Sequence, residues 1–405
     1  MLALAMGLHK AYKGYKSFSY LEPGKDFREF RLVKEIGRVE PFVYPVSPTE
    51  EERVRELLEK SVVISLHDHA KVMPESFDDL FAWIRANHTS TGFEGLAASG
   101  LDAVFDGLGD GSNMITSSYP WKWESVVHEL GMRLCDLAHQ DFVIRGERVE
   151  DIRRAHREGK IAFIPHIEGA APIENELDRV DILYGLGVRC MGLVYSDSNA
   201  LGSGLRERAD GGLTYFGEEV VERMNKLGML IDVAHAGDKT TLDAIDVSKV
   251  PIVISHAGAR SVWNSQRMKP DNVLQRLAEK GGVIGIEAAP HTTMSKAHPL
   301  HSLESYMDHY EYCVGLMGID HVTFGPDTNF GDHAGLHRYF SKNPSVAWRE
   351  AGDTYEEVAY VKGLENPSEF PNVVRWLVHN GYSDIEIKKA LGGNTLRVLE
   401  AAWKE

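Results

Sequence analysis

The feature that most constrains the fold is a series of eight short runs of apolar or β-branched residues, separated by segments with helical spacing. Many of these runs end in a histidine, a carboxylate or another polar residue with useful chemistry. The eight predicted strands are residues 62–65, 101–105, 161–164, 188–194, 229–233, 251–255, 283–287 and 321–324. Eight strands alternating with helices is the count of a closed parallel barrel, so the sequence predicts an α/β fold, a single (β/α)8 TIM barrel.

The connecting segments agree with this prediction. Apolar residues at helical spacing, together with stop signals such as Gly228 and the pair Gly281-Gly282, mark several connecting helices. The clearest predicted helices are residues 49–60, 216–227, 271–280 and 384–403, the last interrupted by Gly392-Gly393. A barrel with insertions commonly needs the length of this chain, 405 residues, so length does not demand a second domain.

Three further segments lie outside the strand and helix repeat. Residues 71–99 and 330–369 are too long for simple barrel loops, and we expect them to build over the C-terminal mouth. Residues 1–50 show no clear period and end in a proline-rich stretch. We predict an N-terminal arm over residues 1–50, packed on a barrel of residues 51–405.

Composition excludes several classes of partner. A net charge of −16 and the lack of a basic stripe disfavour nucleic acid. The apolar start, residues 1–8, lacks a basic leader and a cleavage pattern, and no apolar stretch approaches the ~20 residues that cross a bilayer. We therefore expect a cytoplasmic protein without a membrane partner, and a homo-oligomer is compatible with the arm. The cysteines, Cys135, Cys190 and Cys313, form no CxxC pair and are predicted to be buried free thiols.

The candidate metal ligands follow the predicted strands. His67 and His69 flank Asp68 after the first strand, and the period of two in an extended chain places both imidazoles on one side. Carboxylates and imidazoles also follow four later strands. These further candidates are Glu168, His235, His256 and Asp327. Active sites of this fold lie at the C-terminal mouth, where all six would meet.

These side chains favour hydrolytic chemistry. Neutral imidazoles and carboxylates bind zinc-like divalent ions, and we predict two ions, expected to be Zn²⁺. A metal pair ~3.5–4 Å apart can activate a bridging hydroxide and polarise a carbonyl. The pattern therefore predicts metal-dependent hydrolysis.

The order of these motifs resembles the membrane dipeptidase (renal dipeptidase, peptidase family M19) family of the amidohydrolase superfamily. The resemblance runs from about residue 62 to 403 and is most specific at residues 184–189 and 212–232. It implies that His67 and His69 hold one metal, that Glu168 bridges, and that His235 and His256 hold the second.

The resemblance also implies roles outside the histidine ligands. Asp327 would act as general acid and base, besides belonging to the predicted metal set. Arg260 would grip a substrate carboxylate with its guanidinium fork, or it forms a structural ion pair. Two positions depart from the family pattern. His69 stands where the family usually has aspartate, and Tyr195 stands where it commonly has a histidine that supports the developing oxyanion. A tyrosine hydroxyl can donate the same hydrogen bond, or Tyr195 is ordinary pocket packing.

Three functions remain open at this point. The leading hypothesis is a binuclear amidohydrolase that cleaves a small amide, a dipeptide first of all. The second is a specialised amidohydrolase that acts on a non-peptide amide, lactam or ester, because His69 and Tyr195 differ from the family pattern. The third is a non-catalytic barrel that binds a ligand or partner, which the retained Glu168 and Asp327 disfavour.

Overall fold

The computed structural model describes residues 10–108, 122–290, 292–342 and 358–404. One sheet of parallel strands runs in the order β10-β1-β2-β4-β5-β6-β7-β8-β9, and β3 pairs with β4 beside this path. The strands are β1 (Ile64–Val72), β2 (Ala103–Leu108), β3 (Val143–Arg145), β4 (Ile161–Ile167), β5 (Cys190–Gly192), β6 (Leu230–Asp232), β7 (Val253–Ala257), β8 (Val283–Ile286), β9 (Val322–Phe324) and β10 (Asn329–Phe330). All eight predicted strands are present.

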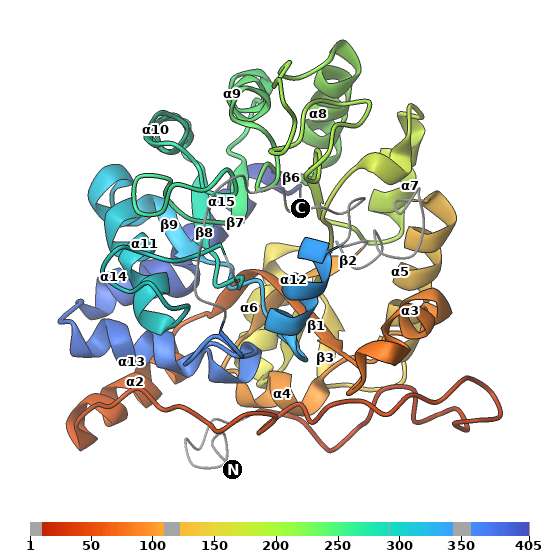
Figure 1. The fold of residues 1–405 in the computed structure, drawn as a ribbon, viewed down its shortest axis with the longest axis vertical. Helices are drawn as coiled ribbons and strands as arrows, with labels where there is room; N and C mark the ends of the chain where they lie inside the picture. Colours follow the sequence, from red (N-terminus) through yellow and green to blue (C-terminus); the bar gives the residue numbers. More distant parts are fainter. Residues whose placement is uncertain (1–9, 109–121, 291, 343–357, 405) are drawn as a thin grey trace.

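The sheet closes on itself through the segment that joins β9 to β10. The backbone N–H of Asp327 donates to the carbonyl of His67 at 3.0 Å, and the N–H of His69 donates to the carbonyl of Thr328 at 2.8 Å. Because β9 also bonds to β8, this segment links the last strand to the first. The predicted eight-stranded barrel is therefore confirmed, with helices arranged around the strands (Figure 1). The short β3 was not predicted.

Helices alternate with the strands, as the sequence predicts. The predicted interruption of residues 384–403 at Gly392-Gly393 is present as a π-helical turn at Lys389–Gly393, which separates α14 from α15. The principal helices are α2 (Pro48–Lys60), α5 (Trp123–Leu137), α6 (Val149–Glu158), α7 (Asp178–Gly185), α8 (Tyr215–Leu227), α9 (Asp238–Val247), α10 (Asp271–Glu279), α11 (Leu303–Met317), α13 (Pro371–His379), α14 (Asp384–Lys388) and α15 (Asn394–Ala402). Thr214 caps the start of α8 through the N–H of Gly217, and Gly228 ends it at φ 81°.

Alternation along the strands divides the apolar core into layers. Phe105 and Ile164 belong to one buried cluster with residues of neighbouring strands, whereas Val104 and Phe163 belong to another that includes residues of α4 (Phe93–Ala98). This is the period of two expected of strands covered on both faces. Polar side chains that could act in a site therefore lie at the strand ends or replace an inward-facing apolar residue.

The two long insertions contain helices of their own. Residues 71–99 hold α3 (Phe77–Ala86) and α4, and the described part of residues 330–369 includes α12 (His333–Lys342). Since α12 begins shortly after β10, it starts at the carboxyl end of the strands, and it lies in front of the barrel in Figure 1. Residues 343–357 of this insertion lie outside the described residues.

Residues 10–50 run along the barrel and contact it at widely separated places (Figure 1). Lys10 Nζ pairs with Asp102 at 2.8 Å, and Tyr15 donates to Asp136 at 2.8 Å. Further along, the N–H of Tyr44 donates to the side chain of Asn372 at 2.9 Å. The apolar start of the sequence lies outside the described residues.

The prediction that the three cysteines are buried free thiols is confirmed for two of them and wrong for the third. Cys190 and Cys313 are buried free thiols as predicted, but Cys135 is exposed. That expectation was wrong for Cys135 because it lies on the outer helix α5, away from the inner face of the helix.

Among the described residues, no helix combines the length and apolar character needed to cross a bilayer.

Candidate metal centre

The barrel brings all six predicted ligands together at the carboxyl ends of its strands. They fall into three overlapping groups whose nitrogen and oxygen atoms lie within 4.8 Å of one another. The groups are His67, His69 and Glu168; His67, His256 and Asp327; and Glu168, His235 and His256. All six residues are buried. Because they come from β1, β7 and the ends of β4, β6 and β9, only the closed barrel places them side by side.

The centre has two halves, and the second half consists of Glu168, His235 and His256. Glu168 Oε1 lies 3.1 Å from His235 Nε2 and 3.4 Å from His256 Nε2. The two Nε2 atoms are 3.0 Å apart. Glu168 Oε1 is also 3.8 Å from His67 Nε2, so this carboxylate lies between the two halves.

The first half of the centre consists of His67, His69 and Asp327. Asp327 Oδ1 lies 3.1 Å from His69 Nε2 and 3.5 Å from His67 Nε2. Asp327 adopts φ 57°, a left-handed conformation that a residue with a side chain rarely takes. Such strain persists only where the surroundings hold it, and it clusters at functional sites.

Irregular strand pairing turns two of the histidines into the barrel. The register between β1 and β2 shifts between Ser65 and Asp68, on either side of His67. The register between β7 and β8 shifts between Ile254 and Ala257, next to His256. Such irregularities re-aim side chains beside active sites. As a result, the rings of His67 and His256 stack with centroids 3.7 Å apart.

Gly107 on β2 makes room for the first half. A Cβ at this position would lie 2.5 Å from His69 Cε1 and 2.8 Å from His67 Cε1, which real Cβ contacts do not reach. The carbonyl of Gly107 in turn lies 3.1 Å from His69 Nδ1 and can accept a hydrogen bond from its N–H. Glycine therefore permits both imidazoles to approach the strand and orients one of them.

The electrostatics suit metal binding. Burial lowers the pKa of His67 to about 3. Burial and, after it, the charge of Arg267 hold the pKa of His235 well below its usual range. Burial and, after it, the neighbouring His67 do the same to the pKa of His256. These imidazoles are therefore neutral, the form that binds a metal. His67 Nε2 is buried and makes no hydrogen bond within the described chain. Four imidazoles and two carboxylates thus fit divalent metal ions.

Asp327 supplies the negative charge of the first half. Burial alone would raise the pKa of Asp327, but the close contacts with His67 and His69 and the nearby His256 outweigh burial and hold the pKa well below the usual range. The carboxylate is therefore ionised and can accept a proton.

The structure separates the two remaining predicted residues. Tyr195 lies beside the centre, with its ring stacked on His235 at a centroid distance of 4.0 Å. Arg260 instead forms a two-pronged ion pair with Asp238, at 2.6 and 2.9 Å, and its Nε donates to backbone carbonyls. Its guanidinium is thus already engaged, and its role toward a substrate stays a prediction.

A second arginine of the same loop contacts the centre directly. Arg267 is buried, donates to the carbonyl of His256 at 2.8 Å and to that of Ala234 at 3.3 Å, and pairs with buried Glu287 at 2.5 Å. The sequence analysis missed Arg267 because a loop arginine has no periodic pattern that reveals burial. Its spacing from His256 was the only signal available.

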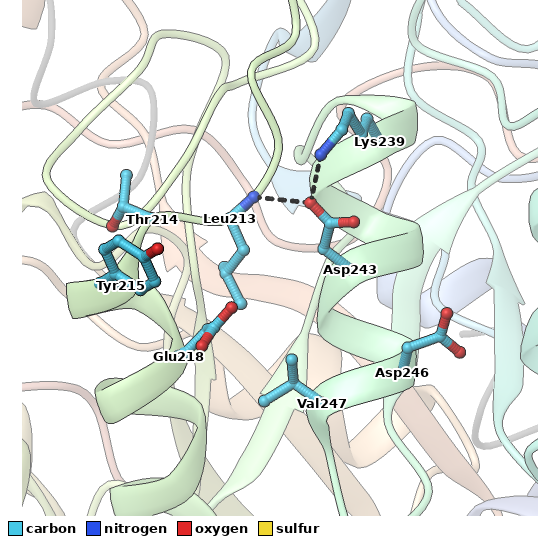
Figure 2. Close-up of a pocket in the computed structure, with 8 residues that line it drawn as sticks. All are labelled: Leu213, Thr214, Tyr215, Glu218, Lys239, Asp243, Asp246 and Val247. Atoms are coloured by element: carbon cyan, nitrogen blue, oxygen red, sulfur yellow. Dashed lines mark hydrogen bonds and ion pairs between the residues drawn. The ribbon is translucent and has the colours of Figure 1, made fainter.

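An open pocket elsewhere carries no such chemistry. This pocket of about 500 Å³ lies between α8 and α9 (Figure 2). Its charged lining includes Asp243, which is already paired with Lys239 at 2.7 Å. None of the six predicted ligands lines it. Donor chemistry, rather than volume, therefore locates the candidate site.

Comparison with known proteins gives a consistent picture. The membrane dipeptidase family (peptidase family M19) matches residues 52–337 and 351–404. Dipeptidase tcpJ of Claviceps purpurea is 30% identical over 273 residues, which are 67% of this chain and 58% of that protein. The chain thus spans less than two thirds of the length of this curated relative.

Solved structures share the same architecture. The crystal structure of an amidohydrolase from Pseudomonas aeruginosa is 25% identical, with a TM-score of 0.72, over 87% of this chain and 99% of the other. A metallo peptidase from Rhodobacter sphaeroides, liganded with a phosphinate mimic of the dipeptide L-Ala-D-Ala, is 19% identical with a TM-score of 0.65. It covers 85% of this chain and 100% of its own. With a family match across most of the barrel and its predicted ligands gathered at one mouth, the chain belongs to the membrane dipeptidase family, peptidase family M19.

Proposed function

We propose that this protein hydrolyses dipeptides with the help of two divalent metal ions, most simply Zn²⁺. The observation that carries the proposal is the convergence of four histidine Nε2 atoms and two carboxylates at the barrel mouth. Glu168, placed between the two halves, suits a bridging ligand. Family membership and the dipeptidase names of relatives support the same reaction.

The side chains divide the work of hydrolysis. Divalent ions bound here would supply Lewis acidity, which polarises an amide carbonyl and lowers the pKa of an attacking water to ~7. As the water oxygen bonds to the carbonyl carbon, Asp327 accepts its proton. When the carbon–nitrogen bond breaks, Asp327 delivers that proton to the leaving amine. Tyr195, beside His235, would donate its hydroxyl to the developing oxyanion.

The substrate is small and carries a carboxylate. Both arginines of the β7–α10 loop are already paired, Arg260 with Asp238 and Arg267 with Glu287, but Arg267 is the one that touches the ligand-bearing segments. The phosphinate dipeptide mimic in the Rhodobacter sphaeroides structure is a ligand of the same size and class. These features support a dipeptide over a long peptide.

The test pairs metal content with turnover. Gently purified protein is analysed for metals, and a panel of L,L and L,D dipeptides is assayed before and after chelation. We expect about two divalent ions per chain and chelator-sensitive cleavage that returns when Zn²⁺ is restored. Two ions without dipeptide cleavage would contradict the substrate and point to a non-peptide amide, lactam or ester. No bound metal would contradict the catalytic proposal altogether.

A further inference from the structure

Three buried polar side chains lie inside the barrel next to the metal centre, and none of them is a candidate ligand. They are His166 on β4, Asp232 on β6 and Ser255 on β7, each at most 1% exposed. His166 follows Ile164 by two residues on the same strand, so it replaces an inward-facing apolar residue. Burying three polar groups in this layer is costly unless they bond to one another.

Their contacts form one continuous chain between the two halves of the centre. His67 Nδ1 lies 3.1 Å from His166 Nδ1, and His166 Nε2 lies 3.3 Å from Asp232 Oδ2. From the other side, Ser255 Oγ lies 2.7 Å from His256 Nδ1 and donates to Asp232 Oδ2 at 2.7 Å. Since β5 separates β4 from β6, the contact between His166 and Asp232 crosses the barrel interior.

One placement of protons gives each contact of this chain one donor and one acceptor, although the contact of His166 Nε2 with Asp232 is a 3.3 Å approach without hydrogen-bond geometry. The Nε2 atoms of His67 and His256 face the centre and must be free of protons to bind a metal, so each Nδ1 carries the proton. His67 Nδ1–H then donates to His166 Nδ1, which leaves the proton of His166 on Nε2, facing the Asp232 carboxylate. His256 Nδ1–H donates to Ser255 Oγ, whose hydroxyl donates to the same carboxylate.

Asp232 is held as the fixed acceptor of both branches. Its Oδ1 accepts from the N–H of Ser255 at 2.8 Å and from the N–H of Ala234 at 3.0 Å. Burial by itself would raise the pKa of Asp232, but His166 and the Ser255 donors outweigh it and keep the pKa below the usual range. An ionised, immobile carboxylate is thus the anchor for one histidine in each half.

We propose that His166, Asp232 and Ser255 form a positioning network that fixes the tautomer of His67 and His256 and couples divalent-ion binding in the two halves of the centre. Partners behind ligand histidines orient the ring and raise its basicity. Here one carboxylate serves both halves, so a break in either branch affects both ion positions. This inference rests on the metal-binding part of the proposed function and does not depend on the substrate.

The first experiment measures ion affinity rather than turnover. Metal-stripped full-length protein is titrated with Zn²⁺ against a chromogenic chelator, and with Co²⁺, whose visible absorption reports ligand geometry. His166→Leu removes both contacts of His166. We expect a loss of affinity of about 10- to 100-fold at both positions and a changed Co²⁺ spectrum. Wild-type affinity at either position would overturn the proposed coupling.

Two graded variants separate the contacts. His166→Asn keeps an acceptor near His67 but falls short of Asp232, whereas His166→Gln extends a donor toward Asp232 without an acceptor for His67. We expect each to bind both ions better than His166→Leu and worse than wild type. Equal affinities for all three variants and wild type would show that His166 only fills space.

Ser255→Ala tests the other branch and keeps the proposal testable if the His166 variants fail to fold. Its matched control is Thr323→Val, because Thr323 is also a buried strand hydroxyl but donates to the carbonyl of Ala390, outside the network. Ser255→Ala is expected to weaken both ion positions and shift the Co²⁺ spectrum, while Thr323→Val changes only thermal stability. If the two variants behave alike, the network is structural and the inference is wrong.

The design separates this inference from the proposed function. If the wild-type protein binds two ions but cleaves no dipeptide, the substrate proposal fails and the network remains measurable. If wild-type binds two ions and all network variants match it, the network proposal fails alone. If the wild-type protein binds no divalent ion, both proposals are contradicted.

Discussion

The two halves of the metal centre present the same ligand atoms in different surroundings. In the first half, His67 and His69 face the carboxylate of Asp327 on a strained backbone. In the second half, His235 and His256 share Glu168 and lie beside a buried cation, Arg267. The contrast in charge suggests a division of labour.

That division follows from what each neighbour can do. A carboxylate next to an activated water can move protons, so the first half suits proton transfer. The guanidinium of Arg267, paired with Glu287, donates to the backbone carbonyl of His256, so the second half has a rigidly held ligand segment. The stacked rings of His67 and His256 hold the two halves in contact.

The largest expected effect comes from Asp327→Asn in the first half. The amide keeps the size of the side chain but cannot take a proton, so turnover should fall about 10²- to 10⁴-fold. Both metal ions should still be found by elemental analysis, because the other ligands remain. Full turnover in this variant would remove the proton-transfer role from the first half.

The next effect concerns Tyr195, beside the second half. Tyr195→Phe keeps the ring that stacks on His235 and removes only the hydroxyl. If that hydroxyl supports the oxyanion, kcat should fall about 10²-fold with unchanged metal content. The control is Tyr215→Phe, since Tyr215 is 89% exposed on α8. An equal kcat for both variants would show that Tyr195 only packs in the pocket.

The two arginines of the β7–α10 loop give a smaller and more selective effect. Arg267→Lys should raise KM by about 10- to 100-fold, because hydrogen bonds to a charged group are lost, with little change in bound metal. Arg260→Lys should change KM little, because Arg260 is engaged by Asp238 and, unlike Arg267, does not donate to a segment that carries a ligand. A larger KM effect for Arg260→Lys would instead support the role that the family resemblance implies.

The smallest effect is one of stability at Gly107. Gly107→Ala forces a Cβ against His67 and His69 and should lower the free energy of unfolding by about 1–3 kcal/mol, measured by denaturant titration. Gly315→Ala on α11 is the control, because nothing lies within 4 Å of its added Cβ and alanine favours helix. Equal stability of the two variants would show that the first half has room to spare.

Much of the architecture could be predicted because it is written in local patterns. Apolar runs of strand length and helical spacing between them gave eight strands in the correct order, and polar residues after those runs marked the mouth. Strand β3 was missed because three residues that end in Arg145 carry too little apolar pattern. Local signals fail where an element is that short.

The sequence by itself determined the barrel and the six residues that gather at its mouth, since periodicity and residue type suffice for these, and the order of its motifs carried the resemblance to the family. Only the tertiary structure decided how the six are aimed. The irregular pairing around His67 and His256, the burial of Arg267 and the chain through His166 and Asp232 join residues that are distant in sequence. Such contacts depend on closure of the barrel and on its packing, which no local pattern of residues encodes.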